Sequence, residues 1–196
     1  MISRIATKND IQGILNLQEA NLFDNLSEED RKKGFVTTPF TIKQLDELLV
    51  ENGLFIVEHE DRIKAYTMAA GWEYFSQWPI FPYMISRLSG MTFNNLTISK
   101  TNSFQYGPIC VDSALRGSNA FPSLFKEMRV AFSHKYPIGI TFINRVNERS
   151  YKAHMQKLGM AVIDEFEFSG REYYGLAFDT QKSVLNKVFE KRKSAI

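Results

Sequence analysis

The stretch that decides the fold is SFQYGPICVDSALRGSNAFPSLF, which spans residues 103–125. Its first part predicts a strand that ends near Val111, and a polar turn follows over residues 116–119. A helix is then indicated by apolar residues at helical spacing, namely Phe121, Leu124, Phe125, Met128 and Phe132. Unpaired backbone N–H groups and the positive end of the helix dipole favour anions at such a helix start, so we expect phosphate oxygens there.

The composition is that of one ordinary globular domain. The chain has 196 residues, of which 44% are hydrophobic and 23% are charged. We therefore expect a single domain over 1–196, with no disorder and no fibrous repeat. The formal net charge is only +2. Because the basic residues are scattered, we expect no nucleic-acid partner, and we interpret the basic run at 191–193 as a solvated terminus.

Cysteine usage and hydropathy point to an intracellular location. Cys110 is the single cysteine, so it has no partner for an internal disulfide. The first residues lack the pattern of a signal peptide, and no apolar stretch approaches the length needed to cross a bilayer. We expect a cytoplasmic protein that does not bind membranes.

Strands and helices alternate along the rest of the chain. Before residue 72 the patterns predict a strand at 2–6, helices near 9–18 and 41–52, and a hairpin over 54–70. Thr41 and Gln44 form a predicted capping box for the second of these helices. Beyond the opening stretch we expect a strand at 138–143, a helix from Asn147 to Gly159, a closing hairpin over 160–178, and a C-terminal helix or tail over 180–196.

An aromatic-rich insertion at 72–102 separates the third and fourth strands, with a short helix expected from Ile80 to Leu88. A connection of this length is unusual unless it is functional or has structure of its own. Its aromatic residues have two interpretations. They cover a face of the sheet as additional core, or Trp72, Glu73 and Tyr74 form a wall of a pocket for a small molecule.

The order of elements resembles the Gcn5-related N-acetyltransferase (GNAT) family, and two motifs make the resemblance specific. That family has a phosphate-binding turn of the pattern Gln/Arg-x-x-Gly-x-Gly/Ala, and this chain has RGSNAF at 116–121. Asn119 stands where the family has glycine, and we expect it to tolerate a left-handed backbone. Phe121 stands where a small residue is usual, and we expect its side chain to point into the core.

The second motif is the later helix, NERSYKAHMQKLGM at 147–160, which is similar to the family's Asn-x-x-Ala/Ser helix that ends in Leu-Gly. Counted from Asn147, His154 falls where many members carry a tyrosine near the sulfur of coenzyme A. The resemblance covers most of residues 2–178. It implies an α/β (mixed α+β) fold with a central, mostly antiparallel mixed sheet flanked by helices.

The resemblance also implies an activity, which is direct transfer of an acetyl or other acyl group from acetyl-CoA to an amine of a small molecule or peptide. In that family the fourth strand diverges from its neighbour, and its backbone pairs with the pantetheine arm. The residues implied to bind the cofactor are Ile109, Val111, Arg116, Gly117, Ser118, Asn119, Ala120, Phe121 and Asn147. No metal is expected, and formation of a homodimer is left open.

Candidate catalytic groups follow from the chemistry of amide formation, which needs a neutral amine, a donor to the carbonyl oxygen and a proton for the leaving thiolate. The amide of Val111 is a candidate donor to the oxygen. His154 and then Tyr151 are candidates for the proton donor, and Glu73 and Tyr106 for the base. Each also has a purely structural interpretation, as a helix-packing histidine, a surface carboxylate or a core tyrosine.

Two further alternatives stay open at this point. Cys110 is a nucleophile by type, but alternation along a strand directs it away from the face of Ile109 and Val111, so we interpret it as a buried structural thiol. The imperfect phosphate turn and the lack of an unambiguous base also fit a non-catalytic, acyl-CoA-binding regulatory module.

Overall fold

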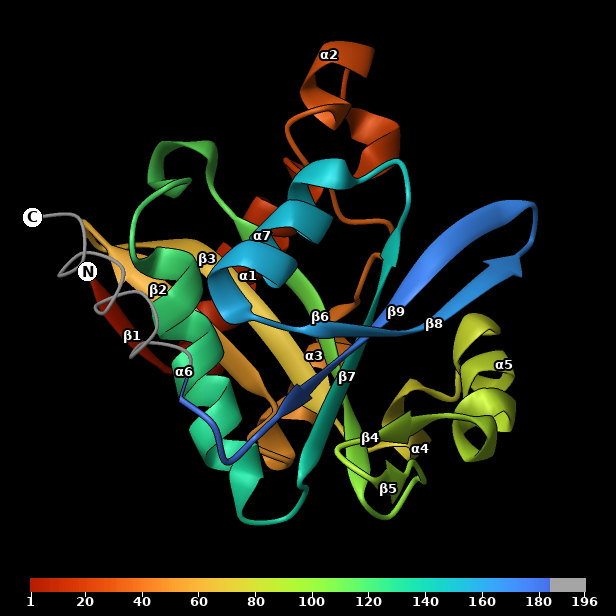
Figure 1. Ribbon diagram of the computed structural model, residues 1–196. Coiled ribbons are helices and arrows are strands. Elements are labelled where there is room, and N and C mark those ends of the chain that lie inside the picture. Colours follow the sequence, from red (N-terminus) through yellow and green to blue (C-terminus); the bar gives the residue numbers. More distant parts are fainter. Residues whose placement is uncertain (184–196) are drawn as a thin grey trace, which may run out of the picture.

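A seven-stranded mixed sheet forms the centre of the computed structural model, which describes residues 1–183 (Figure 1). The strand order is β1-β2-β3-β6-β7-β9-β8, and all neighbouring strands are antiparallel except β6 and β7. The strands are β1 (Ile2–Ile5), β2 (Leu54–His59), β3 (Arg62–Ala70), β6 (Ser103–Val111), β7 (Ile138–Asn144), β8 (Ala161–Phe168) and β9 (Arg171–Asp179). The fold predicted from the sequence is confirmed.

The one parallel pairing in this sheet is short. β6 and β7 are paired only at the positions Ser103–Ile138, Phe104–Gly139 and Gln105–Ile140. Beyond Gln105 both strands continue without pairing to each other. On its other side β6 stays paired to β3 up to Val111, with a register shift opposite the residues between Thr67 and Ala69. The sheet therefore opens between two of its central strands.

Helices cover both faces of the sheet (Figure 1). Buried residues of α6 (Ala120–Ser133) and α7 (Glu148–Leu158) belong to the core cluster on one face, and those of α1 (Ile11–Glu19) and α3 (Ile42–Val50) to the cluster on the other. A four-residue helix α2 (Glu28–Arg31) lies in the segment between α1 and α3. Short 3-10 turns occur at Lys8–Asp10, Phe23–Asn25, Leu88–Gly90 and Ser113–Leu115.

Local sequence signals explain several element ends. The capping box of Thr41 and Gln44 starts α3 as predicted, and the side chain of Asn147 accepts a hydrogen bond from Ser150 N at the start of α7. Gly159 ends α7 in the left-handed conformation at φ 63°. Glu60 and Asp61 take positive φ angles in the tight turn between β2 and β3.

The aromatic insertion folds into α4 (Trp72–Phe75), α5 (Ile80–Arg87) and a small hairpin of β4 (Thr92–Phe93) and β5 (Leu96–Thr97). Trp72 is buried and its Nε1–H donates to the hydroxyl of Ser103 at 3.0 Å. The ring of Phe75 stacks on that of Phe81, with centroids 4.8 Å apart. The interpretation of the insertion as additional core is therefore correct for most of its aromatic residues.

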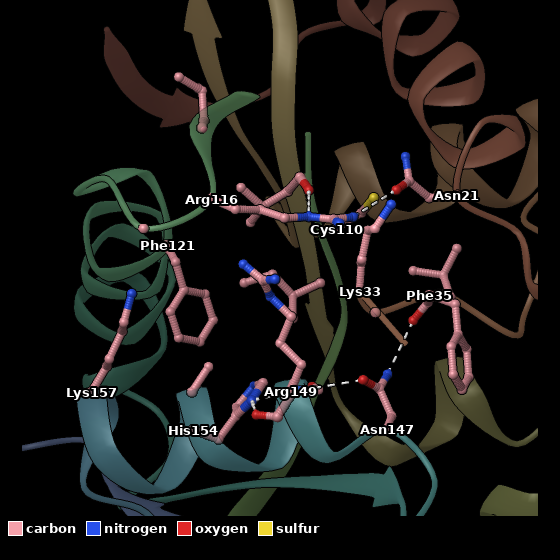
Figure 2. A pocket seen from close by; sticks show the side chains of 18 residues that line it. Asn21, Lys33, Phe35, Cys110, Arg116, Phe121, Asn147, Arg149, His154 and Lys157 are labelled. Carbon is pink, nitrogen blue, oxygen red and sulfur yellow. Dashed lines mark hydrogen bonds between the residues drawn. The ribbon is translucent and has the colours of Figure 1, made fainter. Parts of the chain in front are cut away.

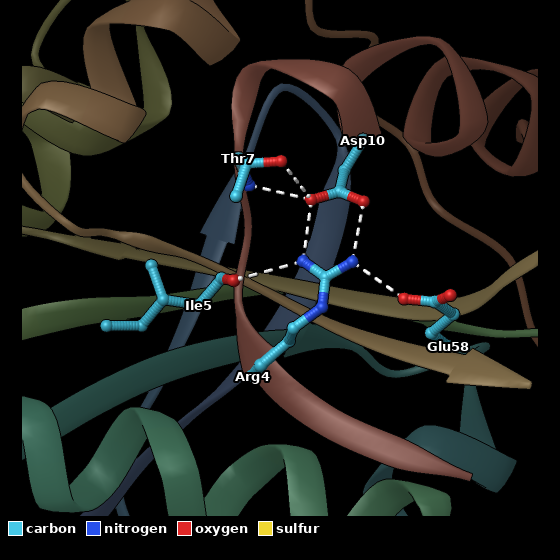
Figure 3. A network of polar contacts seen from close by, with 5 residues as sticks. All are labelled: Arg4, Ile5, Thr7, Asp10 and Glu58. Carbon is cyan, nitrogen blue, oxygen red and sulfur yellow. Dashed lines mark hydrogen bonds and ion pairs between the residues drawn. The ribbon is translucent and has the colours of Figure 1, made fainter.

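An ion-pair network ties the edge strand β1 to its surroundings (Figure 3). The guanidinium of Arg4 donates to both carboxylate oxygens of Asp10, at 2.7 and 2.9 Å, and to Glu58 on β2 at 2.7 Å. Asp10 also accepts from the backbone N–H and the hydroxyl of Thr7. Its side chain is only 9% exposed, so these contacts are poorly screened by water.

The described part of the chain ends at residue 183. The helix or tail predicted for 180–196, with Val184, Leu185, Val188 and Phe189 on its apolar side, lies almost wholly outside the described residues, which end at 183. Among residues 1–183, none of the helices has the length and apolar character that crossing a bilayer requires.

Candidate functional site

Two cavities meet where β6 and β7 separate. The first, which we call the cationic cavity, lies between the start of α6 and one face of α7. Its lining includes four basic side chains, those of Lys33, Arg116, Arg149 and Lys157 (Figure 2). No aspartate or glutamate of residues 1–183 lines it. This charge distribution favours an anionic ligand.

Arg116 is the most constrained of these cations. Its Nε donates to the carbonyl of Val111 at 3.1 Å, and its terminal nitrogen donates to Oδ1 of Asn21 at 3.1 Å (Figure 2). Burial, with a smaller contribution from the positive charge of Arg149, lowers the pKa of Arg116. A guanidinium stays protonated in proteins, so a positive charge is held at this point, and Asp112 and Asp30 offset it only in part.

The turn before α6 presents backbone N–H groups to the same region. The N–H of Ser118 donates to a preceding carbonyl, and that of Ala120 donates to the Ser118 hydroxyl at 3.1 Å. Within residues 1–183, no hydrogen-bond partner is found for the N–H groups of Gly117, Asn119 and Phe121. Together with the dipole of the 14-residue helix α6, such groups form an anion site of the predicted kind.

The open edge of β6 carries a second set of polar groups. Asp112 N donates to Lys64 O across the β3–β6 pair at 2.8 Å. Because hydrogen-bonded and non-hydrogen-bonded positions alternate in an antiparallel pair, the N–H and C=O of Val111 point away from β3. The bond from Arg116 to the Val111 carbonyl agrees with this direction. Two positions earlier, Ile109 has the same orientation, so β6 offers an edge to which an extended ligand can pair.

The second cavity, which we call the uncharged cavity, continues the first through the gap between β6 and β7. None of its lining residues, all of which belong to the described part of the chain, is Asp, Glu, Lys or Arg. The residues that line both cavities are Phe35, Val36, Ile109, Asn147, Ser150 and His154.

His154 lies at this junction and its protonation is fixed by the helix that carries it. The ring is 2% exposed, and Nδ1 lies 2.7 Å from the carbonyl oxygen of Ser150, one turn earlier on α7. A carbonyl only accepts, so Nδ1 carries the proton. Nε2 is then a bare acceptor, and it has no partner within residues 1–183. Burial lowers the pKa of His154 to about 4, so the ring is neutral at physiological pH.

The structure brings most of the predicted cofactor residues to one place. Those that line the cationic cavity are Ile109, Val111, Arg116, Gly117, Phe121 and Asn147, together with His154. Ser118, Asn119 and Ala120 form the adjoining turn without lining the cavity. The amide of Asn147 is engaged within the protein, since Nδ2 donates to Phe35 O at 3.3 Å and Oδ1 accepts from Ser150 N. Its position fixes the start of α7 against the segment that precedes α3.

Three of the four candidate catalytic residues line neither cavity. Tyr151 packs its ring on Tyr174, with centroids 4.5 Å apart. Tyr106 is fully buried behind the site, with its ring centroid 5.7 Å from that of His154. Glu73 belongs to α4 rather than to the end of the third strand, because β3 stops at Ala70.

Glu73 lies on the protein surface and lines neither cavity. Its side chain is 81% exposed and pairs with Lys100 at 2.6 Å. Neither Trp72 nor Tyr74 lines either cavity; the Tyr74 hydroxyl instead donates to Gln44 O at 2.9 Å. Trp72, Glu73 and Tyr74 therefore contribute to neither of these two cavities. The insertion contributes Phe81 to the uncharged cavity instead.

Two expectations about the phosphate turn need correction. Asn119 has φ −78° and is not left-handed, because Gly117 takes the positive φ of this turn, at 90°. Phe121 packs only in part against the core. It is half-buried, lines the cationic cavity and sets its ring edge-on to His154, with centroids 5.2 Å apart (Figure 2). Phe121 lies in the first turn of α6, at the border of the apolar face of this helix.

Other residues of the site were not recognised in the sequence. Arg149 and Lys157 lie on the face of α7 that also carries His154, and the helical spacing from Asn147 could have identified them. Lys33 reaches the cavity from a loop with no sequence signal. Gln105 lines the uncharged cavity from β6.

Cys110 behaves as the buried thiol that alternation along the strand predicts. It packs in the core cluster opposite to that of Ile109 and Val111. Burial raises its pKa to about 12, so it is protonated at neutral pH and a poor nucleophile.

Many solved structures share this fold. An N-acetyltransferase from Staphylococcus aureus superposes with a TM-score of 0.59 at 18% identity, over 92% of this chain and 98% of that one. A GNAT-family acetyltransferase from Streptococcus agalactiae gives a TM-score of 0.62 at 12% identity, over 92% and 96%. The Salmonella typhimurium protein yncA, solved with its cofactor acetyl-CoA, gives 0.60 at 12% identity, over 92% and 94%.

These similarities establish the fold. The chain has the architecture of the GNAT acetyltransferases, and the resemblance predicted from the two motifs is confirmed at that level. No family model matches the sequence, and no curated protein matches it.

Proposed function

We propose that this protein is an acyl-CoA-dependent N-acyltransferase that transfers an acetyl group, or another acyl group, to an amine. The observation that carries the proposal is the gap between β6 and β7. It joins a cationic cavity to an uncharged one, with the bare acceptor Nε2 of a neutral histidine at the junction. A protein with this fold, yncA, is solved with acetyl-CoA, which supports acetyl-CoA as the donor.

The residues present fit a molecule of coenzyme A. Its phosphates would be held by the unpaired N–H groups of the turn at 117–121 and by Arg116 and Arg149. Phosphate groups carry a high negative charge, so several hydrogen-bond donors and cations are needed to bind them. The amides of its pantetheine arm would pair with the open edge of β6 at Ile109 and Val111. In its acylated form, acyl-CoA, this molecule would supply an acyl group activated as a thioester.

The chain's own groups complete the chemistry. The N–H of Val111 points into the gap and would stabilise negative charge on the carbonyl oxygen. His154 is unsuited to the first role predicted for it, because Nε2 has no proton to give to a thiolate. We propose instead that Nε2 accepts a proton from the amine, and that the imidazolium so formed then returns it to the departing sulfur.

The test combines binding with turnover. Calorimetry with CoA measures occupancy of the cationic cavity, and release of free thiol from acetyl-CoA with a panel of amines measures transfer. Binding and amine-dependent thiol release together support the enzyme. Binding without thiol release on any amine contradicts it and leaves the acyl-CoA-binding regulatory module as the explanation. Absence of binding contradicts the site itself.

A substitution locates the bound molecule. Arg149→Ala should weaken the binding of CoA about tenfold or more, because a charge-assisted contact to phosphate contributes at least about 1.5 kcal/mol. Binding of S-acetylpantetheine, which lacks the phosphates, should not change. Arg62→Ala removes an exposed arginine on β3 outside both cavities and serves as the matched control. Equal effects of the two substitutions would contradict the placement.

A further inference from the structure

Five aromatic side chains form one part of the wall of the uncharged cavity. Phe81 and Phe142 meet edge to face with centroids 5.4 Å apart, and Phe142 meets Tyr173 in the same way at 5.6 Å. Phe35 and Phe40 contribute further rings. The remaining polar groups of the lining are hydroxyls and amides, together with the neutral ring of His154. A flat apolar molecule fits such walls, because offset and edge-to-face contacts between rings are favourable.

Gln105 adds a hydrogen-bond acceptor, because the orientation of its side-chain amide is determined by one hydrogen bond. Its Nε2 donates to the carbonyl oxygen of Tyr106 at 2.8 Å, and a carbonyl oxygen can only accept, so the other atom of the amide is the oxygen. Oε1 is buried and has no partner within residues 1–183, on a side chain that is only 2% exposed. A buried acceptor without a donor is costly, and a ligand that supplies an N–H group removes that cost.

His154 presents a second acceptor, and here too a hydrogen bond to a backbone carbonyl determines which atom is the acceptor. A backbone carbonyl takes the proton of Nδ1, so Nε2 is left as an acceptor without a partner. Gln105 and His154 both line the uncharged cavity, one from β6 and the other from α7. Two unpartnered acceptors in one cavity call for a ligand group with at least one, and preferably two, N–H bonds.

Charge then narrows the class of ligand. An alkyl ammonium ion would lose its hydration in this cavity and find no carboxylate among the lining residues. Cation–π contacts with the rings recover only part of that loss. An amine attached directly to an aromatic ring is weakly basic and therefore neutral near pH 7, but it keeps its two N–H bonds.

Given the proposed function, on which this inference rests, we propose that the uncharged cavity binds the acceptor, and that the acceptor is a neutral aromatic or heteroaromatic primary amine. Its ring lies among the aromatic side chains and its NH₂ group faces Gln105 and His154. Such an amine needs no prior deprotonation, which accounts for a site without a carboxylate base. The nitrogen forms a bond to the acyl carbon while the carbon–sulfur bond breaks and leaves its electron pair on sulfur. The proton lost by nitrogen passes through Nε2 of His154 to that sulfur.

Matched acceptors test the class with the unaltered protein. With acetyl-CoA as donor, thiol release and the mass of the product are measured for aniline, 4-methylaniline and 3-aminopyridine, and for benzylamine, phenethylamine and cyclohexylamine. We expect kcat/KM at pH 7 to be at least about tenfold higher for the aromatic amines, because an unpaired buried charge is costly. Higher kcat/KM for the alkyl amines overturns the inference and leaves the acyltransferase proposal intact. No transfer to any amine contradicts both, whereas the CoA-binding measurement still reports on the cationic cavity.

A substitution provides a second readout. Gln105→Glu places a carboxylate in the cavity and should shift the ratio of kcat/KM, aromatic over alkyl, at least about tenfold toward the alkyl ammonium acceptors. Gln156→Glu makes the same chemical change at an exposed position of α7 and should leave the ratio unchanged. An unchanged ratio in a folded Gln105→Glu protein would contradict the assignment of the cavity. If that variant does not fold, the acceptor series on the unaltered protein decides.

Discussion

Nδ1 of His154 lies 2.7 Å from the carbonyl oxygen of Ser150, and this contact determines which nitrogen of the ring faces the rest of the site without a proton. The sequence placed a histidine near the expected position of a proton donor. The hydrogen bond to the helix backbone reverses that role, because the free nitrogen can only accept. Burial reinforces the effect by disfavouring the doubly protonated ring.

His154→Gln should lower kcat with an aromatic amine by a factor of about 10² to 10⁴, the usual contribution of a positioned acid–base group. Affinity for CoA should change little, because the phosphate contacts lie elsewhere. His134→Gln, at an exposed position after α6, is the matched control. A variant at residue 154 with full activity would exclude the proton-accepting role.

Under the proposed function, the pH profile of the unaltered protein follows from the pKa of about 4 for His154. The deprotonated ring is the active form, so kcat/KM for a neutral amine should be flat through the physiological range and fall only as the pH approaches 4. Steady-state rates at constant ionic strength measure this dependence. A decline centred near the ordinary histidine pKa of about 6.5 would show that the ring is not held neutral by burial.

Gly117 and Gly90 provide a matched pair for the phosphate turn. A Cβ at either position meets no atom within 4 Å, but Gly117 has φ 90° whereas Gly90 has no such positive angle. Gly117→Ala should therefore destabilise the turn by about 1–2 kcal/mol, the cost of the left-handed region for a residue with a side chain. We expect weaker CoA binding in this variant and no effect of Gly90→Ala, both measured by calorimetry and denaturant unfolding.

Glu73→Gln should leave kcat/KM unchanged for every amine tested. The carboxylate is exposed, pairs with Lys100 on the surface and contributes to neither cavity. Exposed ion pairs contribute less than about 1 kcal/mol to folding, so stability should change little as well. Thiol-release assays and thermal melting test both statements. A large loss of activity would restore Glu73 as a candidate base.

Asp10 is expected to make folding sensitive to acid. Its hydrogen bonds from Arg4, and then those from Thr7, hold the pKa of this carboxyl below its ordinary value of 3.8. The resulting stability is present above that ordinary value and is lost as the pH falls below it, because only the folded state keeps the carboxylate charged. Asp10→Asn should cost about 2 kcal/mol at pH 7, as expected for charge-assisted bonds.

Urea unfolding at pH 7 and pH 3 measures the contribution of Asp10, with Asp24→Asn as the control at an exposed position. The difference between the unaltered protein and Asp10→Asn should shrink at the lower pH. A difference that stays the same at both pH values would mean that the charge of Asp10 does not contribute to the network.

The sequence predicted the order of elements, the sheet and the half of the site that is local in the chain. The turn at 116–121 and the cap at Asn147 are short-range features, and residue type reveals them. The position of Glu73 was wrong because a β-rich run gave no sign that β3 ends at Ala70 and a helix begins. Phe121 was assigned to the core because a residue at the border of an apolar stripe can turn either way.

The uncharged cavity was beyond the reach of the sequence for a different reason. Its lining combines Phe40, Phe81, Gln105, Thr141 and Tyr173, which come from five separate parts of the chain. Which of them face the same space depends on how β6 and β7 diverge, and that divergence follows from long-range pairing. The neutral state of His154 likewise depends on burial by residues distant in sequence.

The early end of the pairing between β6 and β7 divides the sheet into two blocks, β1-β2-β3-β6 and β7-β9-β8, which are joined through three residue pairs. A ligand that pairs with the edge of β6 would contact both blocks. Because it binds only the folded protein, its binding would increase the free energy of unfolding. Amide hydrogens on both blocks should then exchange more slowly when the ligand is bound than when it is absent. Under the proposed function, the resistance of the protein to proteolysis in a cell would increase with the concentration of acyl-CoA.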